Sequence, residues 1–151
     1  MVCLGNICRS PLAEGILRSL ALKHQLASLL EIDSAGTAGH TAGSFPDPRS
    51  QAVAQLHGIT LNHRARKLIK KDFEFFDHIL VMDKTNLQFV LGQAGDSAKD
   101  KVRLITDFDF RENSPRIVAD PYYGNLQHFH DVYEQILHCC QGWLREYFQI
   151  K

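Results

Sequence analysis

The chain has 151 residues, enough for one domain that buries about two-thirds of its unfolded surface. Apolar residues make up 44% of it and charged residues 23%, which is ordinary for a soluble globular protein. Because 17 basic side chains balance 17 acidic ones, we expect no nucleic-acid partner, and any anion site must be built locally.

No stretch approaches the roughly 18 apolar residues of a membrane span, and no charged-then-apolar leader opens the chain. The four cysteines are too few and too clustered for a secreted disulfide framework; they are Cys3, Cys8, Cys139 and Cys140. We therefore expect a cytoplasmic protein with reduced thiols, in which residues 1–151 form one domain.

The first half of the chain alternates between helical and extended patterns. Leucine and isoleucine at helical spacing predict a helix over residues 11–25. The apolar run at 29–33 predicts a buried strand, and the Gly-, Ser- and Pro-rich stretch 36–49 predicts a surface loop. A helix over 48–57 is expected to end at Gly58.

The second half continues this alternation. Its predicted elements are a helical turn at 73–76, a strand at 78–83, a helix at 85–92, a strand at 102–106, an irregular stretch at 107–125 and an amphipathic helix at 129–147. Strands that alternate with helices predict an α/β domain with a parallel sheet. Ligands of such sheets bind beyond the carboxyl ends of the strands.

The stretch VCLGNICRSP, residues 2–11, lies at the first crossing from strand to helix. If the five residues between Cys3 and Arg9 curl at a helix N-terminus, their N–H groups converge on one anion. Gly5 and Asn6 tolerate the left-handed backbone that such a curl needs. Arg9 adds a fork that matches two phosphate oxygens, so this CX5R pattern predicts a phosphate-binding loop.

The same loop suits a nucleophile, because cysteines at helix N-termini or beside cations ionise more readily than free thiols. Cys3 could then attack phosphorus while Arg9 and the loop N–H groups stabilise the transition state. The alternative is that Cys3 and Cys8 are core residues flanking a turn. A Walker loop is excluded because no Gly-Lys-Ser/Thr follows, and the cysteine spacing disfavours a zinc knuckle, so we expect no metal.

A phosphate ester also needs a proton for its leaving group. Asp120 is the best candidate, because Pro121 stiffens the turn Asp-Pro-Tyr-Tyr-Gly that it opens and two aromatic residues follow. Asp107 and Asp109 are rivals that lack an equally defined turn.

The Cys-loop and the DPYYG turn together resemble the low-molecular-weight protein tyrosine phosphatases. Matching stretches run in order along essentially the whole chain: IDSAGT at 32–37, PDPRS at 46–50, HGI at 57–59, HRAR at 63–66, residues 72–83 and the Cys-Cys pair of the last helix. The resemblance implies a three-layer α/β domain, phosphotyrosine phosphatase I-like, with a four-stranded parallel sheet flanked by helices. It also implies that no metal or cofactor is needed.

The resemblance assigns roles residue by residue. Cys3 forms a cysteinyl-phosphate, Arg9 clamps the phosphoryl oxygens, and Asp120 protonates the phenolate and later activates water. Asn6, Ser10, Ser34 and His63 match positions that brace the loop, with Ser10 bonded to the thiolate. The implied phosphate- and substrate-binding positions are Leu4, Gly5, Asn6, Ile7, Cys8, His40, Tyr122 and Tyr123.

Relatives with other chemistries remain as alternatives. Arsenate reductases on this fold use further cysteines in mid-chain, and none lies between Cys8 and Cys139. Protein-arginine phosphatases typically carry Thr where Ile7 stands and lack the double tyrosine. A non-catalytic phosphate-binding module would be expected to lose a catalytic side chain. We therefore expect phosphotyrosine in a protein or peptide as the substrate, with phosphate or other oxyanions as ligands.

Two positions depart from the family pattern. His40 stands where the family usually has an aromatic pocket wall, which leaves the substrate preference open between a titratable donor and a solvated loop residue. Only Met1 and Val2 precede the motif, whereas a strand usually pairs over about 4–6 residues. We therefore expect a shortened first strand and a lower stability. Cys8, by analogy, could form a protective disulfide with Cys3 under peroxide.

Overall fold

A four-stranded parallel sheet forms the middle of the protein, in the order β2-β1-β3-β4. The structure, a computed structural model, describes residues 1–150. The strands are β1 (Val2–Cys3), β2 (Ala35–Gly36), β3 (Ile79–Val81) and β4 (Val102–Leu104). The helices are α1 (Arg9–Lys23), α2 (Pro48–Leu56), α3 (Lys70–Phe75), α4 (Lys84–Gln93) and α5 (Leu126–Phe148), with 3-10 turns η1 (Ala27–Leu29), η2 (Asp96–Lys101) and η3 (Ile105–Phe108).

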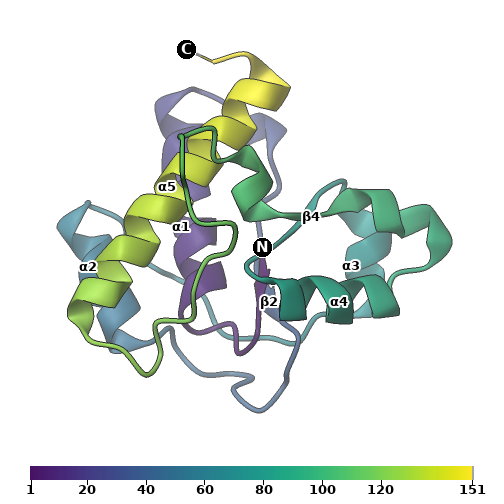
Figure 1. The fold of residues 1–151 in the computed structure, drawn as a ribbon, viewed down its shortest axis with the longest axis horizontal. Helices are drawn as coiled ribbons and strands as arrows, with labels where there is room; N and C mark the ends of the chain where they lie inside the picture. The colour runs from purple at the N-terminus through teal and green to yellow at the C-terminus, as the bar shows by residue number, and fades with distance from the viewer. Residues whose placement is uncertain (151) are drawn as a thin grey trace.

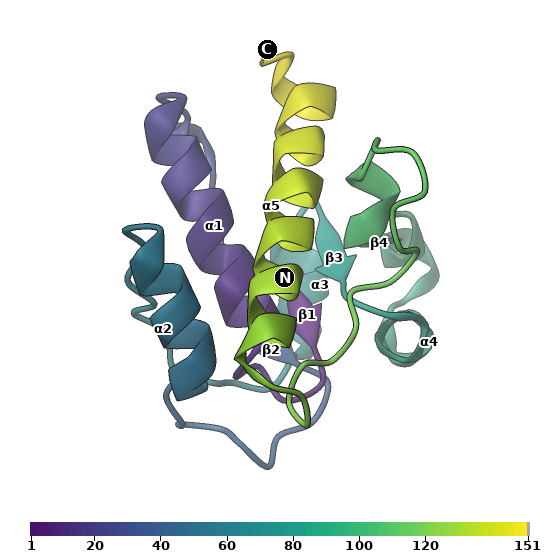
Figure 2. The ribbon, with the colours of Figure 1, turned by 60° about the vertical axis from the view of Figure 1, so that its left-hand side comes forward.

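Helices cover both faces of the sheet, which confirms the predicted three-layer α/β fold. Helices α1, α2 and α5 pack together on one side, and α3 and α4 lie on the other, as Figures 1 and 2 show. The alternating side chains of β3 serve both layers. Leu80 belongs to the core under α1 and α5, whereas Ile79 and Val81 belong to the core under α4.

The loops that leave β1 and β2 gather with the turn before α5 at one end of the molecule (Figure 2). This is the carboxyl edge of the sheet, where the site was predicted. Gly36 permits the close approach there, because a Cβ atom on it would lie 2.7 Å from the carbonyl oxygen of Leu4. Two helices that start at this end have carboxylate N-caps: Asp47 accepts a bond from Arg49 N at 2.8 Å, and Asp83 accepts one from Asn86 N at 2.8 Å.

Most predicted elements are found, but the strand predicted at 29–33 is wrong. The 3-10 turn η1 occupies 27–29, and the strand β2 is Ala35–Gly36. The cause is pairing, because the register places Ala35 and Gly36 opposite the two residues of β1. The first helix also begins at Arg9, two residues before Pro11, and β4 ends at Leu104, where η3 continues the chain.

The first strand is as short as expected, although it occupies a central place in the sheet. The ammonium group of Met1 donates to the carbonyl oxygen of Asp33 at 2.9 Å, and burial lowers its pKa. A cavity of about 280 Å³ opens beside Met1, with Leu30, Ile32 and Phe76 among its lining residues. This cavity lies at the end of the sheet opposite the loops.

In the part of the chain that the structure describes, no helix is long and apolar enough to cross a membrane.

Candidate active site

Cys3 ends β1 with its sulfur inside the curl of the following loop. Its Sγ atom lies 3.0 Å from Ser10 Oγ and accepts a hydrogen bond from Asn6 N at 3.3 Å. The side chain is only 2% exposed. Asn6 has φ 55°, the left-handed conformation that turns the chain back toward the sulfur. The chain therefore curls back at Asn6, and the Cys3 sulfur lies against the Asn6 N–H group and the Ser10 hydroxyl.

The Asn6 side chain fixes this curl from behind, and all its hydrogen-bonding capacity is used. Its Nδ2 donates to Ser10 Oγ at 2.8 Å and to Ser34 Oγ at 3.0 Å. Its Oδ1 accepts from His63 Nε2 at 2.7 Å and from Arg66 N at 2.9 Å. Asn6 is completely buried, and its bonds to Ser10 and Ser34 are buried with it. The four residues predicted to support the loop thus form one network.

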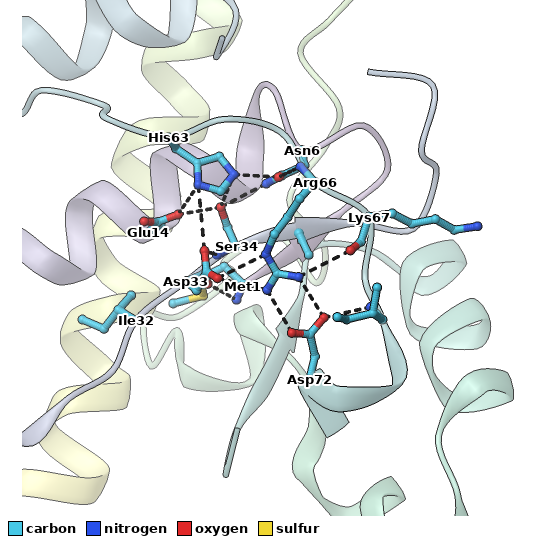
Figure 3. Close-up of polar contacts among 12 residues, drawn as sticks. Met1, Asn6, Glu14, Ile32, Asp33, Ser34, His63, Arg66, Lys67 and Asp72 are labelled. Atoms are coloured by element: carbon cyan, nitrogen blue, oxygen red, sulfur yellow. Dashed lines mark hydrogen bonds and ion pairs between the residues drawn. The ribbon is translucent and has the colours of Figure 1, made fainter. Parts of the chain in front are cut away.

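His63 links this network to a carboxylate, as Figure 3 shows. Its Nδ1 lies 3.1 Å from Glu14 Oε2, while its Nε2 faces Asn6 Oδ1. The two ring nitrogens thus lie against an acidic side chain on one side and the Asn6 amide oxygen on the other. Burial alone would raise the pKa of Glu14, but hydrogen bonds from His63 and Ser34 hold it at about 2. The Glu14 carboxylate and the His63 ring together brace the loop.

A second ion cluster joins the first (Figure 3). Arg66 bonds to Asp33 Oδ2 at 3.1 Å and to both carboxylate oxygens of Asp72 at 2.9 and 3.0 Å. Among residues 1–150, Glu14, Asp33 and His63 form the one group with metal-ligand atoms within 4.8 Å of one another. The Arg66 guanidinium already pairs with Asp33, and the His63 ring lies 3.1 Å from Glu14, so side chains of the protein already occupy these carboxylates.

Arg9 opens α1 and is held in one orientation. Its Nη1 donates to Asp83 Oδ2 at 2.6 Å and to the carbonyl oxygen of Val118 at 3.0 Å. Its Nη2 contacts Asp120 Oδ2 at 3.3 Å. Asp83 uses its other oxygen to cap α4. One buried guanidinium thus connects the phosphate-loop helix, the end of β3 and the DPYYG turn.

A cavity of about 260 Å³ lies over Cys3. Its lining consists of Cys3, Leu4, Gly5, Ile7, Cys8, Arg9, His40, Thr41, Asp120, Tyr122 and Tyr123. The structure therefore brings the three predicted catalytic residues together with the predicted pocket residues except Asn6, whose side chain does not line the cavity. Asn6, Ser10, Ser34 and His63 instead form a network of hydrogen bonds behind the loop. The floor is buried at Cys3, and the rim reaches solvent at Tyr123, which is 96% exposed.

The sequence profile of a family described as low molecular weight phosphotyrosine protein phosphatase matches residues 1–150. The chain belongs to this family. The family protein of Gallus gallus is 42% identical over 147 residues, which cover 96% of this chain and 92% of the relative. The Homo sapiens protein is 40% identical with the same coverage.

Solved structures agree with this family assignment. A protein tyrosine phosphatase from Entamoeba histolytica is 32% identical, with a TM-score of 0.94 over 98% of this chain and 94% of that chain. A Drosophila arginine phosphatase is 35% identical, with a TM-score of 0.88 over 97% of this chain and 94% of that one. Proteins with this fold thus include a tyrosine phosphatase and an arginine phosphatase.

The two rivals of Asp120 lie elsewhere in this phosphatase-family fold. Asp107 pairs with Arg103 at 3.4 Å, and Asp109 is gripped by Arg111 at 2.6 Å. Neither lines the cavity over Cys3. Geometry therefore favours Asp120 as the acid.

The two loop cysteines differ in their surroundings. Burial, and then the neighbouring Asp47 carboxylate, raise the pKa of Cys8 to about 12, so Cys8 stays a thiol at neutral pH. Cys3 instead faces Ser10 and a backbone N–H group, which can donate to a thiolate. Burial also raises the pKa values of Cys139 and Cys140, which lie on the buried face of α5.

Sequence reasoning missed several residues that hold this site. They are Glu14, Asp33, Thr41, Arg49, Arg66 and Asp83. Asp83 carried a usable local signal, because it is the last residue of a predicted strand, at the edge where ligands bind. Thr41, beside His40 on the rim, donates its hydroxyl to the carbonyl oxygen of Gly5.

Proposed function

We propose that the chain hydrolyses phosphotyrosine in proteins and peptides, and simple aryl phosphates in vitro, through a cysteinyl-phosphate. One observation carries the proposal: Cys3 and Arg9 of the loop at 2–11 and Asp120 of the distant DPYYG turn line the same cavity of about 260 Å³. The sulfur supplies the nucleophile, the guanidinium a phosphate clamp and the carboxyl a proton.

In the first step, Cys3 Sγ forms a bond to phosphorus while the bond from phosphorus to the phenolic oxygen breaks. Arg9 and the loop N–H groups bind the three remaining oxygens, whose charge they stabilise in the transition state. The proton of the Asp120 carboxyl goes to the leaving oxygen. Because Asp120 contacts Arg9 Nη2, an incoming phosphate competes with Asp120 for that donor.

In the second step, the Asp120 carboxylate accepts a proton from water. The water oxygen bonds to phosphorus, the bond from sulfur to phosphorus breaks, and inorganic phosphate leaves. The returning thiolate is stabilised by Ser10 Oγ at 3.0 Å and by Asn6 N at 3.3 Å. Every step uses side chains of this chain, so the proposal includes activity without a metal or cofactor.

The depth of the cavity supports phosphotyrosine. Leu4, Ile7 and Tyr122 line the walls between the buried sulfur and the exposed rim. An aryl group can span this depth, whereas phosphoserine is too short to bring its phosphorus to Cys3. Phosphoarginine is the second candidate substrate, since the Drosophila structural relative is an arginine phosphatase. Ile7 and the two tyrosines favour the aromatic substrate.

The proposal extends to the setting in which the enzyme works. All four cysteines are free thiols, and an oxidised Cys3 could not attack phosphorus. The proposed location is therefore the cytoplasm, where thiols stay reduced.

Hydrolysis of p-nitrophenyl phosphate in EDTA tests the reaction in the wild type, Cys3→Ser and Asp120→Ala. We expect turnover by the wild type, none by Cys3→Ser and a strong decrease for Asp120→Ala. An inactive wild type would reject the enzyme claim, and an undiminished Asp120→Ala would reject the acid. Matched peptides carrying phosphotyrosine or phosphoarginine decide the substrate: we expect the higher kcat/KM with phosphotyrosine.

A further inference from the structure

An Asp-x-Arg clamp opens helix α2, and the reaction described above does not use it. Arg49 Nε donates to Asp47 Oδ1 at 3.0 Å and its Nη2 to Oδ2 at 2.9 Å. These bonds lower the pKa of Asp47, which is itself buried. The guanidinium plane is thereby fixed on one edge, and its remaining N–H groups point away from Asp47.

Those N–H groups bind the turn that carries Asp120. Nη1 of Arg49 donates to the carbonyl oxygen of Gly124 at 3.1 Å, and Nη2 donates to that of Tyr122 at 2.9 Å. The guanidinium carbon also lies 4.4 Å from the centre of the Phe129 ring. One side chain thus grips two carbonyl groups of the DPYYG turn, from a helix more than 70 residues earlier in the chain.

The same clamp is attached to the phosphate loop. Asp47 N donates to the carbonyl oxygen of Ile7 at 2.7 Å, and Ser50 Oγ donates to that of Cys8 at 3.3 Å. The start of α2 therefore contacts the loop around Cys3 on one side and the acid-bearing turn on the other. It sets the distance between the nucleophile's loop and the acid's loop.

Asp120 needs such an external support. Its side chain is 43% exposed, and it contacts Arg9, a group that the substrate phosphate must also engage. The other bonds of the turn are local: Tyr122 N to Asp120 Oδ1 at 3.1 Å and Gly124 N to Pro121 O at 2.8 Å. Local bonds shape the turn but do not position it over Cys3.

We infer that Arg49 is the positioning residue for the proton donor. Its guanidinium group, fixed by two hydrogen bonds to Asp47, holds the turn that carries Asp120 at the distance from the leaving oxygen that proton transfer requires. The inference rests on the proposed role of Asp120. It predicts a selective defect, because a displaced acid harms only those substrates whose leaving oxygen needs a proton. A dinitrophenolate leaves without one, whereas phenolate does not.

The experiment compares kcat/KM for phenyl phosphate and dinitrophenyl phosphate. For Arg49→Gln we expect about a tenfold loss with phenyl phosphate and less than about twofold with dinitrophenyl phosphate. Arg49→Lys keeps the charge but loses the fork, so it should show the same selectivity. The matched control is Arg111→Gln, which removes an equivalent clamp on Asp109, with bonds of 2.9 and 2.6 Å, and should leave both substrates unchanged.

Asp120→Asn in the same series separates the two hypotheses. If Asp120→Asn shows no leaving-group selectivity, the acid assignment itself is wrong. If it is selective but Arg49→Gln slows both substrates equally, or neither, the inference about Arg49 is overturned. Full activity of Arg49→Lys would overturn the role of the fork.

Inhibition by inorganic phosphate shows whether the phosphate loop survives the substitution. The inhibition constant of Arg49→Gln should stay within about twofold of the wild type, since Arg9 and the loop N–H groups are retained. A large increase would mean that Arg49 supports the loop and not the acid. Should Arg49→Gln fail to fold, Asp47→Asn keeps a helix cap while weakening the clamp. Asp47→Asn should then also lose more activity with phenyl phosphate than with dinitrophenyl phosphate, with a smaller difference than is expected for Arg49→Gln.

Discussion

The two sides of the phosphate loop are built differently. Behind it, Asn6 is completely buried and uses four hydrogen bonds. In the next layer His63 lies against Glu14, and Arg66 pairs with Asp33 and Asp72. In front, Asp120 and Tyr123 are largely exposed and depend on a few contacts. Phosphate binding thus rests on a preorganised and largely buried support, whereas proton transfer and substrate choice rest on a more exposed rim with fewer contacts.

The largest effect is expected behind the loop, for Asn6→Ala. The substitution removes four buried hydrogen bonds and places alanine at φ 55°, so it should destabilise the fold by about 3 kcal/mol or more. Urea unfolding and phosphate inhibition measure the two consequences. Asn113→Ala is the matched control, because Asn113 has φ 59° but is exposed, and it should cost only about 1–2 kcal/mol. Equal losses would show that the network adds nothing.

The pH dependence of stability tests the Glu14 carboxylate of the same region. The folded-state pKa of Glu14 is about 2, below its ordinary value of 4.5, so its stabilisation is present above pH 4.5 and is lost as the pH falls toward 2. Its size is on the order of 3 kcal/mol. We expect Glu14→Gln to be less stable than the wild type at pH 7 and to show a flatter acid limb. Glu74→Gln, at an exposed position, should keep the wild-type curve.

Lengthening the first strand should have a moderate effect on the stability of the fold. An N-terminal extension of five apolar residues would lengthen β1 beside the cavity at Met1, and should raise stability by about 1–3 kcal/mol. Thermal unfolding of the two forms measures this. Equal melting temperatures would contradict the view that the short strand limits stability.

The smallest effect is expected at the rim. His40→Trp adds apolar surface to the cavity mouth without touching the loop or Arg9, so KM for phosphotyrosine peptides should change by about two- to fivefold while kcat is retained. Steady-state kinetics at constant pH measure it. A collapse of kcat would mean that this rim residue takes part in the chemistry, and the contrast between the two sides would fail.

The sequence predicted the reactive residues of the loops but not the distant residues that support them. Cys3, Arg9 and Asp120 were predicted because the chemistry of their loops is local in sequence. Their supports were not: Arg9 meets Asp83 across 74 residues, and Asn6 meets Arg66 across 60. Spacing patterns carry no information about such contacts, which depend on the packed sheet.

The misplaced strand has the same origin. Residues 29–33 have the composition of a buried strand, yet strand formation needs a partner, and β1 offers one only to Ala35 and Gly36. The pairing register with β1, and not the local strand propensity, determined which residues form the strand. The helices were predicted more closely because their apolar spacing and their caps lie within each segment.

The most direct test of the mechanism is detection of the covalent intermediate. Asp120→Ala, mixed with an aryl phosphate and quenched in acid during turnover, should carry one added phosphoryl group on the peptide that contains Cys3, as measured by mass spectrometry. Cys3→Ser/Asp120→Ala should carry none on that peptide. A phosphoryl group found on another residue, or rapid turnover with no labelled Cys3 at any time, would contradict the central claim that this thiol is the nucleophile.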